Sequence, residues 1–146
     1  GALWFTEFKA NQIGRVVPPA PPAPGRLYSL APCRLLDTRN PAGPFGGPAL
    51  VAGADRAFNA SGRCGVPASA RALVVNVTVT QASASGHFTA YPGSAALPPT
   101  STINYSAGQT RANNAILPID SGVFLVRCAQ AAGSAHLIVD VSGYIQ

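Results

Sequence analysis

Groups that carry charge or chemistry are scarce in this chain of 146 residues. Only 10% of the residues are charged, methionine is absent, and the chain has two histidines and three cysteines. Neither His87 nor His136 lies in a nucleophile–base or H-E-x-x-H spacing, and the acidic residues are isolated from one another. We therefore expect a protein that is not an enzyme and that has neither a catalytic metal nor a cofactor.

The cysteines also lack the spacing of a metal site. Cys33, Cys64 and Cys128 form no C-x-x-C motif, and the simplest interpretation is one disulfide plus one free thiol. Cys128 follows the apolar segment VFLVR in phase with Phe124 and Val126. We therefore expect Cys128 to be a small buried hydrophobic residue and not a reactive thiol.

Long apolar runs and clustered basic residues are missing too. No run approaches the roughly 18 residues that cross a bilayer, so we predict no membrane span. The sequence begins with neither Met nor a signal peptide, so we expect any leader of a secreted protein to lie outside it. The net charge is +5, but the arginines and Lys9 are dispersed singly. That distribution argues against a nucleic-acid partner and leaves weak attraction to an anionic surface open.

What the chain does contain is short apolar runs separated by turns, with 15 glycines and 14 prolines. In the run at 71–80, four apolar residues alternate with other side chains: Leu73, Val75, Val77 and Val79. This is the pattern of a half-buried strand. Eight or nine such runs and no helical period predict an all-β fold over residues 27–146, a β-sandwich of jelly-roll or immunoglobulin-like kind. The Pro- and Gly-rich stretch at 40–55 is expected to hold no regular structure.

Residues 1–17 are predicted to form a strand or hairpin that is apolar on both faces. Such a strand is covered on two sides, and a lone hairpin is marginally stable in water. A linker at 18–26, with PPAPPAP at its start, favours polyproline II and spans roughly 20 Å at about 3.1 Å per residue. The hairpin is therefore expected to reach a partner surface through its apolar residues: Leu3, Trp4, Phe5, Phe8, Ile13 and Val16.

Two polar clusters are candidates for a ligand site. Asp37 and Arg39 lie two residues apart on one side of a predicted strand, where a charge-assisted pair would fasten the following loop. The segment GQTRANNA gathers donors and acceptors, as a sugar-binding loop does. For both clusters we favour a structural role and keep a ligand as the alternative. The second cluster consists of Gln109, Arg111, Asn113 and Asn114.

Two segments resemble known families. The N-terminal LWFTEFKANQIGRV resembles one blade repeat of the streptogramin (virginiamycin B) lyase-like β-propellers. It covers part of one blade, so lyase activity is not implied. Residues 31–146, with the motifs PCRLLDTR, GQTRANNA and IVDVSGY, resemble a C-terminal β module of secreted bacterial proteins. That resemblance implies an extracellular setting and a Cys33–Cys64 disulfide, whose loop of about 31 residues would stabilise the fold by a few kcal/mol.

These patterns lead to two hypotheses from different classes. The first is a non-catalytic extracellular structural module whose N-terminal strand completes a sheet of a neighbouring copy, so that copies join into a filament. Within that class, the strand packing on its own domain would leave a monomer. The second hypothesis is a carbohydrate- or cell-surface-binding accessory module of a secreted propeller protein.

Overall fold

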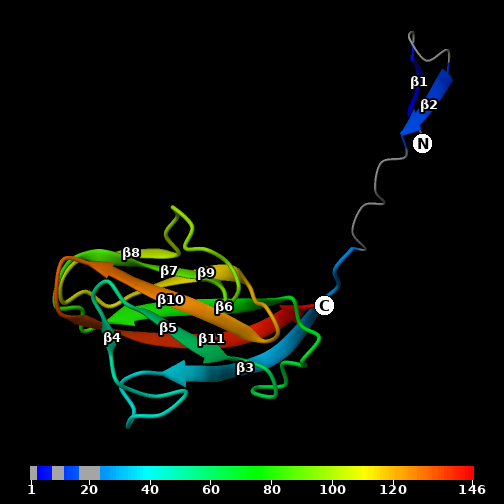
Figure 1. The fold of residues 1–146 in the computed structure, drawn as a ribbon. Coiled ribbons are helices and arrows are strands. Elements are labelled where there is room, and N and C mark those ends of the chain that lie inside the picture. The colour runs from blue at the N-terminus through cyan, green and yellow to red at the C-terminus, as the bar shows by residue number, and fades with distance from the viewer. Residues whose placement is uncertain (1–2, 8–11, 17–23) are drawn as a thin grey trace.

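The computed structural model describes residues 3–7, 12–16 and 24–146, and only the backbone of the first two ranges. The described residues form strands and no helix (Figure 1), so none of them forms a helix that could cross a membrane. The strands are β1 (Leu3–Glu7), β2 (Gln12–Val16), β3 (Leu27–Asp37), β4 (Leu50–Val51), β5 (Asp55–Asn59), β6 (Ala72–Thr80), β7 (Gly86–Pro92), β8 (Ile103–Tyr105), β9 (Arg111–Pro118), β10 (Val123–Gln130) and β11 (Ser134–Ile145).

Strands β3 to β11 make a β-sandwich, as expected, and its topology is a jelly roll. One sheet has the order β3-β11-β6-β9, with β4 paired to one end of β11, and the other has the order β5-β10-β7-β8. The pairs are nested along the chain, because β3 pairs with β11, β5 with β10, β6 with β9 and β7 with β8, all antiparallel. A long hairpin folded over in this way is a jelly roll and not an immunoglobulin-like fold.

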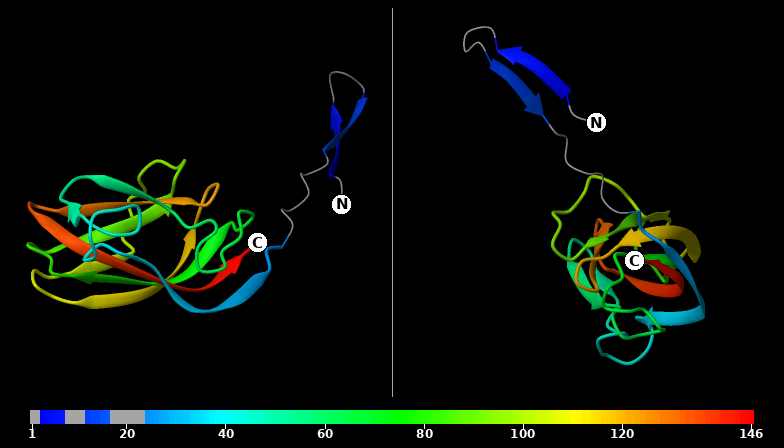
Figure 2. Two further views of the ribbon diagram at one scale, coloured as in Figure 1. Left: turned by 90° about the horizontal axis from the view of Figure 1, so that it is seen from below. Right: turned by 90° about the vertical axis from the view of Figure 1, so that its right-hand side faces the viewer.

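The two sheets face each other (Figure 2), and the buried side chains of the core come from strands of both sheets. On β6 the predicted alternation is confirmed, because Leu73, Val75, Val77 and Val79 are at most 1% exposed while the residues between them are only half-buried. The facing sheet contributes large side chains, among them the fully buried Phe88 and Phe124. Burial of side chains of this size is the main favourable contribution to the stability of the sandwich.

Two details differ from expectation. The stretch at 40–55 was expected to be irregular, yet it contains β4 and a bridge between Ala42 and Gly47. The prediction rested on the Gly and Pro content of the stretch, and it was wrong at Leu50, which is neither of these residues. Leu50 pairs with Ala135 of β11. Strand β3 also begins at Leu27, ahead of the PCRLLDTR motif in which the sequence predicts a strand at Asp37. Its proline is tolerated because β3 is an edge strand.

The N-terminal strands β1 and β2 form a hairpin of their own. They pair antiparallel from Leu3 opposite Val16 to Glu7 opposite Gln12, and neither pairs with a strand of the sandwich. Most of the predicted linker lies outside the described residues, since these resume at residue 24. The predicted contacts of the hairpin also lie outside what is described, since they concern Phe8 and the side chains of Leu3, Trp4, Phe5, Ile13 and Val16.

Candidate functional site

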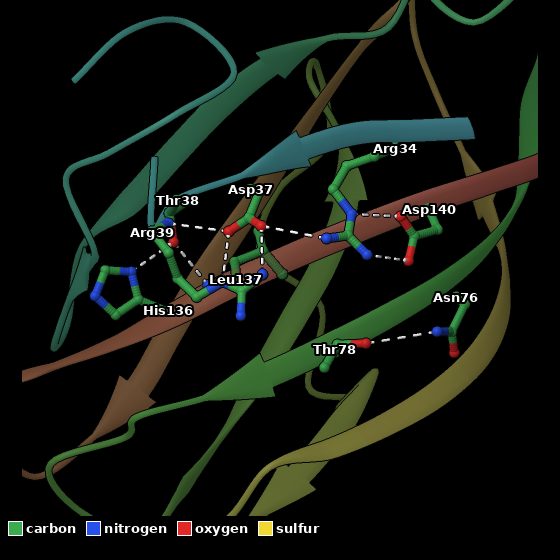
Figure 3. A network of polar contacts seen from close by, with 9 residues as sticks. All are labelled: Arg34, Asp37, Thr38, Arg39, Asn76, Thr78, His136, Leu137 and Asp140. Atoms are coloured by element: carbon green, nitrogen blue, oxygen red, sulfur yellow. Dashed lines mark hydrogen bonds and ion pairs between the residues drawn. The ribbon is translucent and has the colours of Figure 1, made fainter. Parts of the chain in front are cut away.

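A polar network gathers where β3 ends (Figure 3). The Asp37 side chain is almost fully buried, and its carboxylate accepts hydrogen bonds from Arg39 Nη2 at 2.6 Å and Arg39 Nε at 2.9 Å. The Arg39 backbone amide donates to it at 3.0 Å and Arg34 Nη1 at 3.3 Å. The hydrogen bonds from Arg39 are the main cause that lowers the pKa of Asp37 to about 2. Asp37 is therefore ionised and fully engaged at neutral pH.

The same network ties the end of β3 to β11. Arg34 Nε and Nη2 donate to the two carboxylate oxygens of Asp140 at 2.8 and 3.2 Å, which is the planar bidentate arrangement. The Thr38 hydroxyl lies 3.0 Å from His136 Nδ1 and accepts a hydrogen bond from the Leu137 amide at 2.9 Å. These contacts fasten the chain at the point where it leaves the sheet.

The second predicted cluster lies on the opposite edge of this sheet, on β9 and the turn before it. Gln109 Oε1 accepts from the Ser106 amide at 3.1 Å, and Asn113 Nδ2 donates to the Thr102 carbonyl at 2.8 Å. Arg111 and Asn114 are exposed. Because β3 and β9 are the two edge strands, the structure does not bring the two clusters into one site.

A hollow of about 490 Å³ lies beside β3, next to the Asp37 network. It is lined by the end of β3, by the loop at 40–46 and by Arg63. The Arg63 guanidinium lies over the ring of Phe45, 3.8 Å from its centroid. Within the described residues the Arg63 side chain has no hydrogen-bond or ion-pair partner, and its Nε is buried.

The disulfide predicted from the resemblance is present and borders this hollow. Cys33 and Cys64 are bonded, with their Cα atoms 5.7 Å apart. Arg34 follows the first cysteine and Arg63 precedes the second, so one covalent bond holds together the backbone beside both arginines. No sequence motif pointed to Arg34, Arg63 or Phe45 as site residues. The adjacency of two arginines to the expected disulfide was the available signal.

Cys128 is a core residue. Its side chain is fully buried, its Sγ lies 3.6 Å from the Tyr105 hydroxyl, and burial raises the pKa of the thiol. The Tyr105 hydroxyl also donates to Gln130 Oε1 at 2.9 Å. A protonated, enclosed thiol is a poor nucleophile.

No arrangement of three or more His, Cys, Asp or Glu side chains that could hold a metal ion occurs among the residues that the structure describes. Asp55 is paired with Arg127, whose hydrogen bonds lower the pKa of that carboxyl. In comparisons with protein-family models, with curated proteins and with solved structures, the chain shows no significant match.

Proposed function

We propose that the chain is a non-catalytic structural module that joins neighbouring copies by adding its N-terminal hairpin to an exposed sheet edge. The observation that carries the proposal is the outer edge of β9. This strand has eight residues, no strand among the described residues pairs with its outer side, and seven of the eight are not buried. An open edge of this length is a template for a further strand.

The other edges are less suited to accept a strand. The edge strands β8 and β5 have three and five residues, and β3 is interrupted by Pro32 and flanked by the disulfide. β9 also presents Ile116, whose side chain is 64% exposed. An exposed isoleucine on an unpaired strand matches the apolar residues of the hairpin sequence, since burying both removes apolar surface from water.

The setting proposed for this assembly is extracellular. A disulfide such as Cys33–Cys64 forms and persists in oxidising compartments. Added head to tail, the contact between one hairpin and the next sandwich is heterologous, and repetition of it produces an open filament. The partner is therefore a second copy of the same chain.

The proposal is tested by comparing the full chain with a variant that lacks residues 1–17, using light scattering after size exclusion and mass photometry. We expect oligomers that grow with concentration for the full chain and a monomer for the truncated one. If both the full chain and the truncated variant are monomers, the proposed assembly is rejected.

A matched pair of variants locates the accepting edge. The two side chains are similarly exposed, at 64% for Ile116 and 67% for Leu27, so their replacement by lysine is comparable. Ile116→Lys on β9 is expected to abolish the oligomers, while Leu27→Lys on β3 is expected to leave them intact. Equal behaviour of the two variants would exclude β9 as the acceptor.

The second candidate function is binding of a glycan on a cell surface. A small hollow of about 160 Å³ lies between β8 and β9 and is lined by Asn104, Arg111 and Asn113, two of which belong to the predicted polar cluster. Amide and guanidinium groups of this kind suit sugar hydroxyls. The test is a glycan array with the full chain and with Arg111→Ala. A blank array, or signals that Arg111→Ala leaves unchanged, would reject this function.

A further inference from the structure

We propose that the hollow beside β3 is a binding site for a carboxylate, which Arg63 pairs with. Among the arginines of residues 24–146, Arg63 is the one that is half-buried and yet has no acceptor. Arg26, Arg71 and Arg111 are exposed to water, and the others are bonded to carboxylates or carbonyls. A partly dehydrated guanidinium without a partner is costly, and an anion in the hollow that accepts hydrogen bonds from the accessible Nη atoms reduces this cost.

The walls of the hollow are built from two well-fixed loops. Arg56 Nη2 donates to the carbonyls of Gly43, Gly46 and Gly47 at 2.9, 2.7 and 3.1 Å, which holds the first loop. The Phe45 carbonyl also accepts from the Asp37 amide at 2.9 Å. Phe45 is thereby held in place as the flat surface on which the guanidinium lies.

The second loop carries Arg63 itself. The Arg63 amide donates to the Ala60 carbonyl at 3.1 Å, and the Arg63 carbonyl accepts from the Val66 amide at 2.8 Å. Gly62 and Gly65 on either side of it have φ of 77° and 79°, a backbone that side chains disfavour. With the disulfide at the next residue, Cys64, this loop positions the arginine before any ligand arrives.

The charges around the hollow favour a single negative charge. Arg34 and Arg39 are neutralised by Asp37 and Asp140, which leaves the charge of Arg63 unbalanced. One planar guanidinium matches one planar carboxylate. A phosphate, with close to two charges at neutral pH, would need a second free cation. The lining also includes Pro41, Pro44 and Phe45, so the carboxylate is expected on an organic carrier.

Two carriers share this chemistry, a uronic acid unit of a polysaccharide and a small organic acid. Neither depends on strand addition at β9, because β9 is the opposite edge of the sheet. The site therefore stands or falls independently of the proposed assembly.

The test is calorimetric titration of the full chain with trigalacturonate, the monocarboxylate lactate, the neutral trimer galactotriose and inorganic phosphate, each at low salt. We expect at least one carboxylated probe to bind, and the neutral trimer and phosphate to bind at least tenfold more weakly. Binding of trigalacturonate alone identifies the uronic acid source, and binding of lactate alone identifies the small acid.

Variants assign the site. Arg63→Gln is expected to weaken carboxylate binding at least tenfold, and Arg63→Lys, which keeps the charge without the planar fork, less. Arg71→Gln, at an exposed arginine that lines neither of the two hollows, is the control and should bind as the wild type does. Circular dichroism melts verify that each variant is folded.

The proposal is overturned if no carboxylated probe binds, if Arg63→Gln binds as well as the wild type, or if phosphate or the neutral trimer binds as tightly as the carboxylates. Reduction of the disulfide offers an independent measurement on the unmodified sequence. It is expected to weaken binding, because it releases the loop that carries Arg63, and unchanged binding by a reduced, folded protein would contradict the positioning role of Cys64.

Discussion

At the scale of single residues, Asp37 links stability to pH. Its pKa is about 2 in the folded protein and 3.8 ordinarily, because Arg39 donates to the ionised form. A carboxyl group whose pKa is lower in the folded protein than in the unfolded chain stabilises the fold at pH values above its ordinary pKa. This contribution is lost as the pH falls from about 4 towards 2. With both arginine partners about half exposed, the contribution is at most about 2 kcal/mol.

We therefore expect Asp37→Asn to lower the free energy of unfolding by about 1–2 kcal/mol at pH 7 and by less at pH 2.5. Urea unfolding at both pH values measures this difference. Asp120→Asn is the control, since Asp120 is exposed and its side chain bonds only to that of its neighbour Ser121. A loss that is the same at both pH values would show that the charge of Asp37 is not the cause.

Cys128 should be chemically silent in the folded protein. Its complete burial and raised pKa predict that a thiol reagent labels no cysteine under native conditions and one in guanidinium without reductant. After reduction, unfolded chains should show three labelled thiols. Mass spectrometry of the alkylated protein counts them, and rapid native labelling of Cys128 would contradict the packing around Tyr105.

At the scale of elements, β6 tests the register of the larger sheet. Leu73 faces the core and is fully buried, whereas its neighbour Val74 faces outward and is half-buried. Leu73→Ala is therefore expected to cost about 2–5 kcal/mol, and Val74→Ala less than about 1.5 kcal/mol. Urea unfolding measures both, and comparable losses would mean that β6 is not covered on one face as described.

The strands were predictable to different degrees. In β6 and in β11 the alternation is strong enough to identify both the strand and its buried face. β4 was missed because a strand of two residues is too short to show an alternation of apolar and polar side chains. Ala135, which pairs with Leu50 of β4, lies 85 residues further along the chain. The start of β3 was missed for a related reason, since an edge strand that is exposed on both sides has no alternation to detect.

The candidate site was foreseen only in part. The spacing of Asp37 and Arg39 indicated their pairing, because residues two apart lie on one side of a strand. Arg34, Arg63 and Phe45 were not selected, because their proximity depends on loops that are distant in sequence. Only the folded chain shows that the 40–46 loop and the Cys64 turn line one hollow.

At the scale of the whole molecule, the sandwich is complete without the N-terminal hairpin. Its core residues run from Leu35 to Val141, and Arg26 and Gln146 close the two ends through backbone hydrogen bonds of 2.8 and 3.0 Å. Figure 1 shows the C-terminus beside the start of β3. We expect removal of residues 1–17 to change the free energy of unfolding by less than about 1 kcal/mol.

Urea unfolding of the full and truncated chains at low protein concentration provides the measurement, because association is then minimal. A loss above about 2 kcal/mol would show that the hairpin packs on its own domain, and the assembly proposal would give way to a monomer. An unchanged stability together with lost oligomers is the result that the proposal requires.

By itself the sequence determined that this is an all-β sandwich with an N-terminal β extension, because period-two burial and turn residues are local properties of the chain. The Cys33–Cys64 disulfide was expected only as an implication of the resemblance suggested by the motifs of residues 31–146, and the structure contains it. The jelly-roll order and the meeting of Arg34, Asp37 and Arg63 beside one hollow were decided only by the tertiary structure. Both depend on which distant strands pair, and that choice is made by the packing of the whole core.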